Sequence, residues 1–364
     1  MATNASSKDI LGMRLRSQLI EDSRLIADSP RTGVTDTVRH LLAMQAQDFA
    51  QALWAVGVRT PGSRRSDVLA ALERAEVVRS LPMRGTLHFV AAEDLGWMLS
   101  LTAERMLASA AGRLLALDLD PATLDRSAEI VAAALAGGGR LSRAEFMSLL
   151  ESNGISTTGQ RGYHIIFVLC QRRLICWGPP SGTQQALVLL DEWVTAPRVL
   201  ERDEALREFA LRYFAGHGPA TVRDFAWWTK LTLTDARAAI ALAAVELTEL
   251  QNGDDSYWVA NSQADAAPAS KRASAVHVLP GFDEYLLGYQ DRSLPLAVEH
   301  SQRIVPGNNG IFLPLIVSKG RVIGTWRRAP KSTTLEVDYF AEVTAAELAG
   351  FARGAAAHAA FMNG

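Results

Sequence analysis

Gln45 and Gln47 are the residues of this sequence whose type and spacing could do chemistry together. They lie in the stretch HLLAMQAQDFAQALW, residues 40–54, where they interrupt an apolar pattern. Residues two apart lie on one side of an extended segment but on different sides of a helix, so a break between two helices would aim both amides the same way. Such a pair could hold one small polar group. The alternative is a pair of surface amides at a helix boundary.

The surrounding pattern predicts the elements that must position this pair. Helices are expected over residues 10–26, from Thr35 or Asp36 to Met44, and over 49–58. A short helix through Arg74 and two strands, 77–81 and 86–90, follow. Several short helices followed by a β-hairpin are typical of a winged helix.

The same layout of helix, helix and hairpin returns twice. Ser142 with Glu145 forms a capping box, Thr221 begins a later helix, and Thr232 or Thr234 caps the next. We therefore predict a mainly α fold with β structure (α+β), built of tandem winged-helix units and a C-terminal β-barrel-like domain, or a sheet closed by a last helix. The predicted segments are winged helix 1 with the glutamine pair (1–91), a helical connector (92–139), winged helix 2 (140–200), winged helix 3 (201–262), a polar Ala-rich linker (263–274) and the β-barrel-like domain with its helix (275–364).

Composition limits the classes of protein. The 364 residues are 48% hydrophobic and 21% charged, which is typical of a globular protein with a sizeable core. The net charge of -2 means that any nucleic-acid contact must come from a local arginine cluster. Cys170 and Cys176 are expected to be reduced core thiols. No apolar run is long enough to span a bilayer and no signal peptide is recognised, so a cytoplasmic protein without membrane contact is expected.

Several familiar kinds of active site are missing from the sequence. The seven histidines are scattered without metal-ligand spacing. The run 137–139 of three glycines lacks the Lys-Ser/Thr of a phosphate loop, and no Gly-x-Ser-x-Gly elbow is present. We therefore expect no metal and no cofactor.

Two further stretches could contact a polyanion. Arg84, Thr86 and His88 alternate along one expected strand and could hold a phosphate or a base edge, or they could belong to a structural hairpin in which His88 bonds to a backbone carbonyl. The turn of Lys319 and Arg321, with Arg327 and Arg328, is a basic hairpin that suits a DNA groove, or else a solvated turn.

Residues 282–293 mix acids, aromatics and arginine. This composition favours a buried salt-bridged joint over a catalytic dyad. Arg292 in this stretch is assigned to DNA binding together with the two basic stretches above.

Three stretches together resemble the winged-helix alkyl-DNA glycosylase family typified by the azinomycin self-resistance glycosylase. They are MQAQDFAQALWAVGVRT (44–60), LPMRGTLHFV (81–90) and LPGFDEYLLGYQDRS (279–293). The resemblance covers nearly the whole chain. It implies tandem winged helices and a β-barrel around a DNA-binding face, and a catalytic signature of Gln, an apolar residue and Gln, which Gln45, Ala46 and Gln47 match. A sister branch ends this signature in Asp.

The resemblance implies a monofunctional DNA glycosylase that hydrolyses the N-glycosidic bond of N7-alkylated guanine or related bulky or crosslinked adducts. Gln45 and Gln47 would be catalytic, and the partner would be double-stranded DNA carrying alkylated bases, bound by a monomer. The alternative from another class is a non-catalytic winged-helix regulator or a drug-binding resistance protein, since fold does not fix function.

Overall fold

The computed structural model describes residues 3–21, 33–182, 184–264, 276–329 and 334–364. By its internal contacts the chain divides into two units, unit 1 with Met1–Val68 and Leu206–Gly364, and unit 2 with Leu69–Ala205. The end of the first predicted helix (22–26) and most of the predicted linker (265–274) lie outside the described residues. Unit 1 therefore joins segments from both ends of the sequence.

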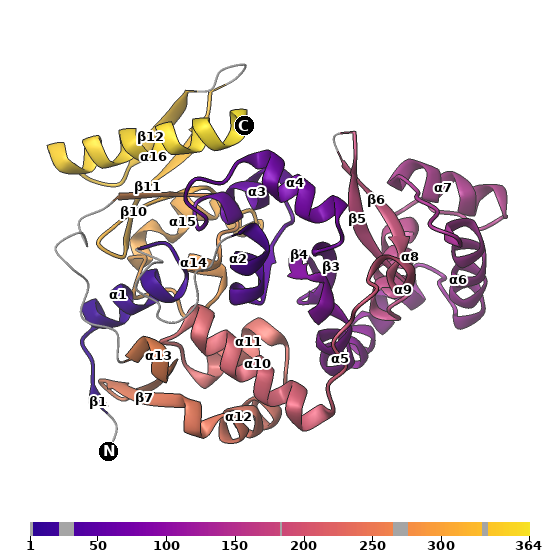
Figure 1. Ribbon diagram of the computed structural model, residues 1–364, viewed down its shortest axis with the longest axis horizontal. Helices are drawn as coiled ribbons and strands as arrows, with labels where there is room; N and C mark the ends of the chain where they lie inside the picture. Colours follow the sequence, from indigo (N-terminus) through magenta and orange to yellow (C-terminus); the bar gives the residue numbers. More distant parts are fainter. Residues whose placement is uncertain (1–2, 22–32, 183, 265–275, 330–333) are drawn as a thin grey trace. The chain divides into compact units, whose positions relative to one another are not determined.

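Unit 1 begins with short elements around the glutamine pair (Figure 1). They are β1 (Thr3–Asn4), α1 (Ser7–Ser17), α2 (Val34–Leu41), β2 (Ala43–Gln45) and α3 (Phe49–Gly57). The prediction for 49–58 is confirmed. The two earlier helices are shorter than predicted: α1 ends two residues before Leu19 (φ 58°) and α2 ends directly before Leu42 (φ 66°), and both of these leucines have a positive φ.

The C-terminal part of unit 1 contains seven α-helices and six strands in its described residues. The helices are α10 (Arg202–His217), α11 (Val222–Thr229), α12 (Leu233–Leu242), α13 (Asn261–Ala264), α14 (Glu284–Leu287), α15 (Ser301–Ile304) and α16 (Ala345–Asn363). The strands are β7 (Leu247–Asn252), β8 (Asp255–Ala260), β9 (Val276–Leu279), β10 (Leu315–Ser318), β11 (Arg321–Arg328) and β12 (Leu335–Tyr339). Thr221 and Thr232 cap α11 and α12 with their hydroxyls, as the sequence predicts.

The C-terminal strands form a four-stranded antiparallel sheet in the order β12-β11-β10-β9. Within the described residues these strands do not close into a barrel, so of the two predicted forms the sheet with a last helix is the correct one. Helix α16 lies beside the C-terminal strands (Figure 1) and contacts β9, and its glycines allow the close approach, since a Cβ on Gly354 would lie 2.5 Å from Val278 Cγ2.

Helix α3 is attached to this sheet by Trp54. The indole Nε1 of Trp54 donates to the carbonyl of Val278 at 2.9 Å, and the ring meets His358 of α16 edge-on with 5.1 Å between centroids. The helix that follows the glutamine pair is therefore fixed to a strand more than two hundred residues later in the chain.

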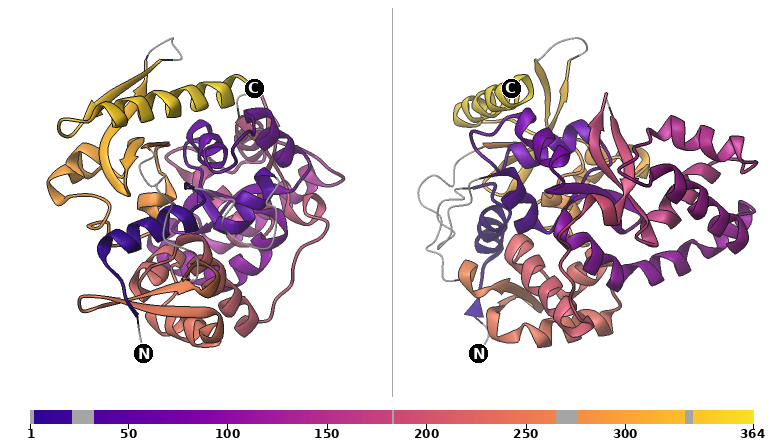
Figure 2. Two further views of the ribbon diagram at one scale, coloured as in Figure 1. Left: turned by 60° about the vertical axis from the view of Figure 1, so that its left-hand side comes forward. Right: turned by 45° about the vertical axis from the view of Figure 1, so that its right-hand side comes forward.

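Unit 2 contains four strands hydrogen-bonded in the order β4-β3-β5-β6. These are β3 (Val77–Met83), β4 (Thr86–Ala91), β5 (Ile175–Ser181) and β6 (Gln184–Leu189). Its helices are α5 (Leu95–Ala116), α6 (Pro121–Leu135), α7 (Arg143–Ser152), α8 (Arg161–Gln171) and α9 (Leu190–Trp193), and α4 (Arg65–Glu73) leads into it. Figure 2 shows α6 and α7 beside each other, next to the β5–β6 hairpin, in agreement with their contacts.

The apolar core of unit 2 comes from α5 to α8 and the facing strand residues, among them Phe146, Leu169 and Leu187 at 0% exposure. The capping box of Ser142 and Glu145 is confirmed at the start of α7. Both cysteines are buried and free. No helix in the described part of the chain is long and apolar enough to cross a membrane.

Candidate active site

The glutamine pair lies in the short connection between helices α2 and α3, with Gln45 at the end of strand β2 and Gln47 in the bend that follows. Helix α2 ends at Leu41, and Leu42 turns the chain with a φ of 66° into β2. A bulky residue seldom adopts this conformation, and Leu42 is held in it at 0% exposure. The next helix, α3, begins after Asp48, whose carboxylate accepts from the backbone N–H of Gln51 at 3.1 Å.

This geometry confirms the predicted helix break. Ala46, between the two glutamines, is completely buried, whereas Gln45 is half-buried and Gln47 is exposed. Gln45 ends strand β2 and Gln47 lies in the bend before α3, so the common direction of the two amides stays a prediction.

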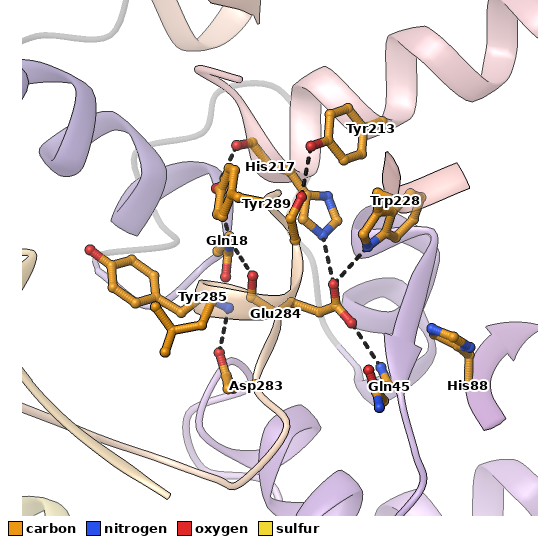
Figure 3. Close-up of polar contacts among 12 residues, drawn as sticks. Gln18, Gln45, His88, Tyr213, His217, Trp228, Asp283, Glu284, Tyr285 and Tyr289 are labelled. Atoms are coloured by element: carbon orange, nitrogen blue, oxygen red, sulfur yellow. Dashed lines mark hydrogen bonds and ion pairs between the residues drawn. The ribbon is translucent and has the colours of Figure 1, made fainter. Parts of the chain in front are cut away.

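The backbone at Gln45 is bonded to a buried carboxylate (Figure 3). The N–H of Gln45 donates to Glu284 Oε1 at 2.9 Å, and the indole N–H of Trp228 donates to Glu284 Oε2 at 2.8 Å. His217 Nε2 lies 3.4 Å from the same Oε2. Strand β2 and helices α10 and α11 thus meet at one carboxylate of α14.

Helix α14 is anchored by a buried ion pair. The guanidinium of Arg59 donates to both oxygens of Asp283, at 2.7 and 2.8 Å, and neither side chain has any exposed surface. Asp283 also caps α14 by accepting from the N–H of Tyr285 at 2.8 Å. The buried salt-bridged joint predicted for residues 282–293 is confirmed.

Three buried tyrosines surround this joint as neutral donors. Tyr289 donates to the carbonyl of His217 at 2.6 Å, Tyr213 to Gly288 at 2.8 Å and Tyr285 to Gly320 at 2.6 Å. Burial raises the pKa of the Tyr289 phenol to about 12 and raises the pKa values of Tyr213 and Tyr285 as well. Their hydroxyls therefore keep their protons and serve as structural hydrogen-bond donors.

The hairpin β3–β4 turns at Arg84 and Gly85, with φ values of 56° and 66°. Arg84 Nη2 lies 2.9 Å from His88 Nε2, and His88 Nδ1 lies 2.8 Å from the carbonyl of Thr86. Since an arginine only donates and a carbonyl only accepts, His88 carries its proton on Nδ1. His88 thus bonds to a backbone carbonyl, as the structural alternative for this hairpin predicts. The residue is also fully buried. A DNA contact by Arg84, Thr86 or His88 stays a prediction.

The four basic residues assigned to the hairpin β10–β11 do not form one cluster. Lys319 and Gly320, with φ of 51° and 78°, make the predicted two-residue turn, and Lys319 and Arg321 are exposed there. Arg327 stands six residues along β11, about 20 Å away. It is bonded to Glu336 on β12 at 2.7 Å.

Arg292 is partly buried, unlike the exposed Lys319 and Arg321. Its Nε donates to the carbonyl of Leu286 at 2.8 Å, and its guanidinium lies 5.1 Å from the ring centroids of Trp227 and Phe312. The side chain therefore supports the end of α14, and its contact with DNA stays a prediction.

A comparison with known protein families shows which family the chain belongs to. The sequence profile described as "DNA glycosylase AlkZ-like" matches residues 38–361. The chain belongs to the AlkZ-like family. It is accordingly an enzyme that hydrolyses N-glycosyl bonds in DNA, and the non-catalytic alternative is set aside.

A sequence comparison and a structure comparison of this AlkZ-like glycosylase agree with that membership. An "Interstrand DNA cross-link repair glycosylase" of Streptomyces sahachiroi is 28% identical in an alignment 338 residues long that covers 88% of this chain and 88% of that protein. The solved structure described as "Streptomyces sahachiroi DNA glycosylase AlkZ" superposes with a TM-score of 0.81 at 26% identity, and covers 98% of this chain and 96% of that one. The fold of the AlkZ-like enzymes therefore extends over the whole chain.

Sequence reasoning missed the residues that support the glutamine segment of this AlkZ-like glycosylase. Glu284, Trp228 and His217 are not among its candidates, although Glu284 stands in the stretch 282–293. The sequence signal that could have revealed Glu284 is the acid pair of Asp283 and Glu284 in an otherwise apolar run. Acids that are buried with their apolar neighbours require polar partners. In the described residues no cluster of three His, Cys, Asp or Glu side chains could hold a metal ion.

Proposed function

We propose that this enzyme removes N7-alkylated guanine, or a related bulky or crosslinked adduct, from double-stranded DNA and leaves an abasic site. Gln45 and Gln47 hold the attacking water near the anomeric carbon. The observation that carries the proposal is the short connection between two helices in which Gln45 and Gln47, neither of them buried, flank the buried Ala46. The crosslinked part of the substrate class is supported by the Streptomyces sahachiroi relative, an interstrand DNA cross-link repair glycosylase.

The chemistry suits two neutral amides. An amide is no strong base, but its carbonyl oxygen can orient a water molecule. An N7-alkylated guanine is already cationic, so its glycosidic bond breaks with little acid assistance and mainly needs an oriented nucleophile and charge stabilisation. An unmodified base lacks this charge, and the enzyme therefore discriminates lesions by their leaving-group ability.

Three hairpins support the assignment of winged helices to this fold. Each of the hairpins β3–β4, β5–β6 and β7–β8 follows helices in the chain, which is the order of a winged helix. In this proposal the β3–β4 hairpin with Arg84 to His88 and the β10–β11 turn contact the DNA backbone. The division of the chain into three winged helices, a helical connector and a C-terminal sheet domain belongs to the same proposal.

The function is tested by incubating the purified protein with duplex DNA that carries N7-methylguanine and then cleaving at abasic sites with alkali. We expect strand breaks at the lesion and free N7-methylguanine, and no breaks in undamaged DNA. Sequence-selective protection of DNA with no abasic product would overturn the proposal.

We expect Lys319→Ala and Arg321→Ala each to weaken binding to duplex DNA regardless of its sequence. A side chain that neutralises one phosphate contributes about 0.9 to the slope of log affinity against log salt, so each variant should lower that slope by about one. Fluorescence anisotropy at a series of salt concentrations measures it. Arg74→Ala is the matched control, since Arg74 is an exposed arginine bonded to Glu76 at 2.7 Å. Slopes equal to that of the wild type would remove the turn from the DNA interface.

A further inference from the structure

Glu284 is a carboxylate with almost no exposed surface, at 2%, and both of its oxygens are engaged. Oε1 accepts from the backbone N–H of Gln45 at 2.9 Å, and Oε2 accepts from the indole of Trp228 at 2.8 Å (Figure 3). Its contact with the glutamine segment is therefore made through the backbone. The amide of Gln45 is left for other use.

A buried carboxylate is a costly way to satisfy one backbone N–H. Removing its charge from water is unfavourable, and a neutral carbonyl would serve the same N–H. What the carboxylate adds is a charge-assisted hydrogen bond, which is shorter and stronger than a neutral one. The peptide plane before Gln45 is thereby held in one orientation, and this orientation sets the direction of the Gln45 side chain.

The backbone of Glu284 is itself fixed by hydrogen bonds to it and to the preceding residue. Gln18 Nε2 donates to the backbone carbonyl of Glu284 at 3.1 Å and is shared with the hydroxyl of Tyr289 at 3.0 Å. Asp283, the preceding residue, is fixed by both nitrogens of Arg59. Glu284 therefore cannot follow the glutamine segment if that segment shifts.

We propose that Glu284 is the positioning residue of this glycosylase. It fixes the backbone of Gln45 so that the amide meets the attacking water, and Trp228 keeps the carboxylate aimed at Gln45. The inference rests on the proposed function, because it assumes that Gln45 holds that water. Glu284 does not touch the substrate, so it affects the rate of the chemical step through Gln45 and leaves the affinity for lesion DNA unchanged.

The test is a double-variant cycle measured by single-turnover excision of N7-methylguanine from duplex DNA at saturating enzyme. Glu284→Gln keeps the shape of the side chain but replaces one acceptor oxygen by a donor. We expect it to lower the rate constant by about 10- to 100-fold, since small misplacements of a positioned group have effects of this size. In the Gln45→Ala background, which keeps the backbone N–H, the same change should have little further effect.

Asp224→Asn is the matched control, because Asp224 is also a buried carboxylate, at 1% exposure, that accepts backbone N–H bonds, from Gln290 and Asp291. It should lower the melting temperature without lowering the saturated rate. Equal effects of Glu284→Gln in both backgrounds, or none in either, would overturn the positioning role alone. A full rate for Gln45→Ala would overturn the proposed function and this inference together.

If Glu284→Gln does not fold, Trp228→Phe replaces it in the cycle, because this change removes one hydrogen-bond donor to the carboxylate. The expected result is the same: a lower rate constant in the wild-type background and little further effect in the Gln45→Ala background.

Discussion

Gln45→Ala and Gln47→Ala each lower the rate of N7-methylguanine excision from duplex DNA by about 100- to 1,000-fold, the range found when one positioned catalytic group is removed. This expectation follows from the proposed mechanism, in which each amide supplies one of the two hydrogen bonds that orient the water. Both side chains reach solvent, Gln47 more than Gln45, so their removal leaves the core of unit 1 intact. The measurement is single-turnover excision at saturating enzyme, with the melting temperature recorded for each variant.

Gln302→Ala is the control for this comparison. Gln302 is an exposed glutamine of the same unit, and its amide donates to Asn308 at 3.1 Å. It should excise at the rate of the wild type. If both Gln45→Ala and Gln47→Ala retain full excision, the catalytic assignment is wrong, and the active site of this family member must lie elsewhere.

Arg59→Met destabilises the enzyme by about 3–5 kcal/mol, the effect of leaving one member of a buried ion pair without its partner. Arg59 makes five hydrogen bonds, two of them to Asp283 and the others to Ala55 and Gln18. Its loss leaves a carboxylate at 0% side-chain exposure with no counter-charge. Urea unfolding followed by tryptophan fluorescence measures the change.

The exposed pair of Arg327 and Glu336 is the matched comparison. It has the same N–O distance of 2.7 Å, but its side chains are 80% and 44% exposed. Water and salt screen such a pair, so Arg327→Met should give no resolvable shift of the unfolding curve. Equal shifts of the unfolding curve for Arg59→Met and Arg327→Met would contradict the prediction, since they would show that the buried Arg59–Asp283 pair adds no more to the free energy of unfolding than the exposed pair.

Local signals were sufficient for much of the fold. The capping box of Ser142 and Glu145 and the caps at Thr221 and Thr232 are visible in four consecutive residues each, and all are present in the structure. The turn at Lys319 and Gly320 could be predicted for the same reason. Such features depend on residues that are neighbours in the chain, so their chemistry can be read directly.

Features that depend on distant residues could not be read in this way. Leu42 ends α2 with a positive φ, and the sequence could not predict this conformation, because leucine rarely adopts it. The contact of Glu284 with Gln45 joins residues far apart, and the spacing of either one gives no sign of the other. Arg327 was grouped with Lys319 because both are basic, whereas strand geometry separates them along β11.

The division of unit 1 between the two ends of the chain has a consequence for synthesis. Gln45 and Glu284 are 239 positions apart, and the intervening unit 2 is continuous in sequence. A ribosome that adds about 5–20 residues each second needs about 10–50 s between the two. During that time the nascent chain carries the glutamine segment without the carboxylate that holds it. On the proposed role of Glu284, we expect competence for base excision to arise only after Glu284 has been made, so that a product terminated before it carries both glutamines without the carboxylate that holds Gln45.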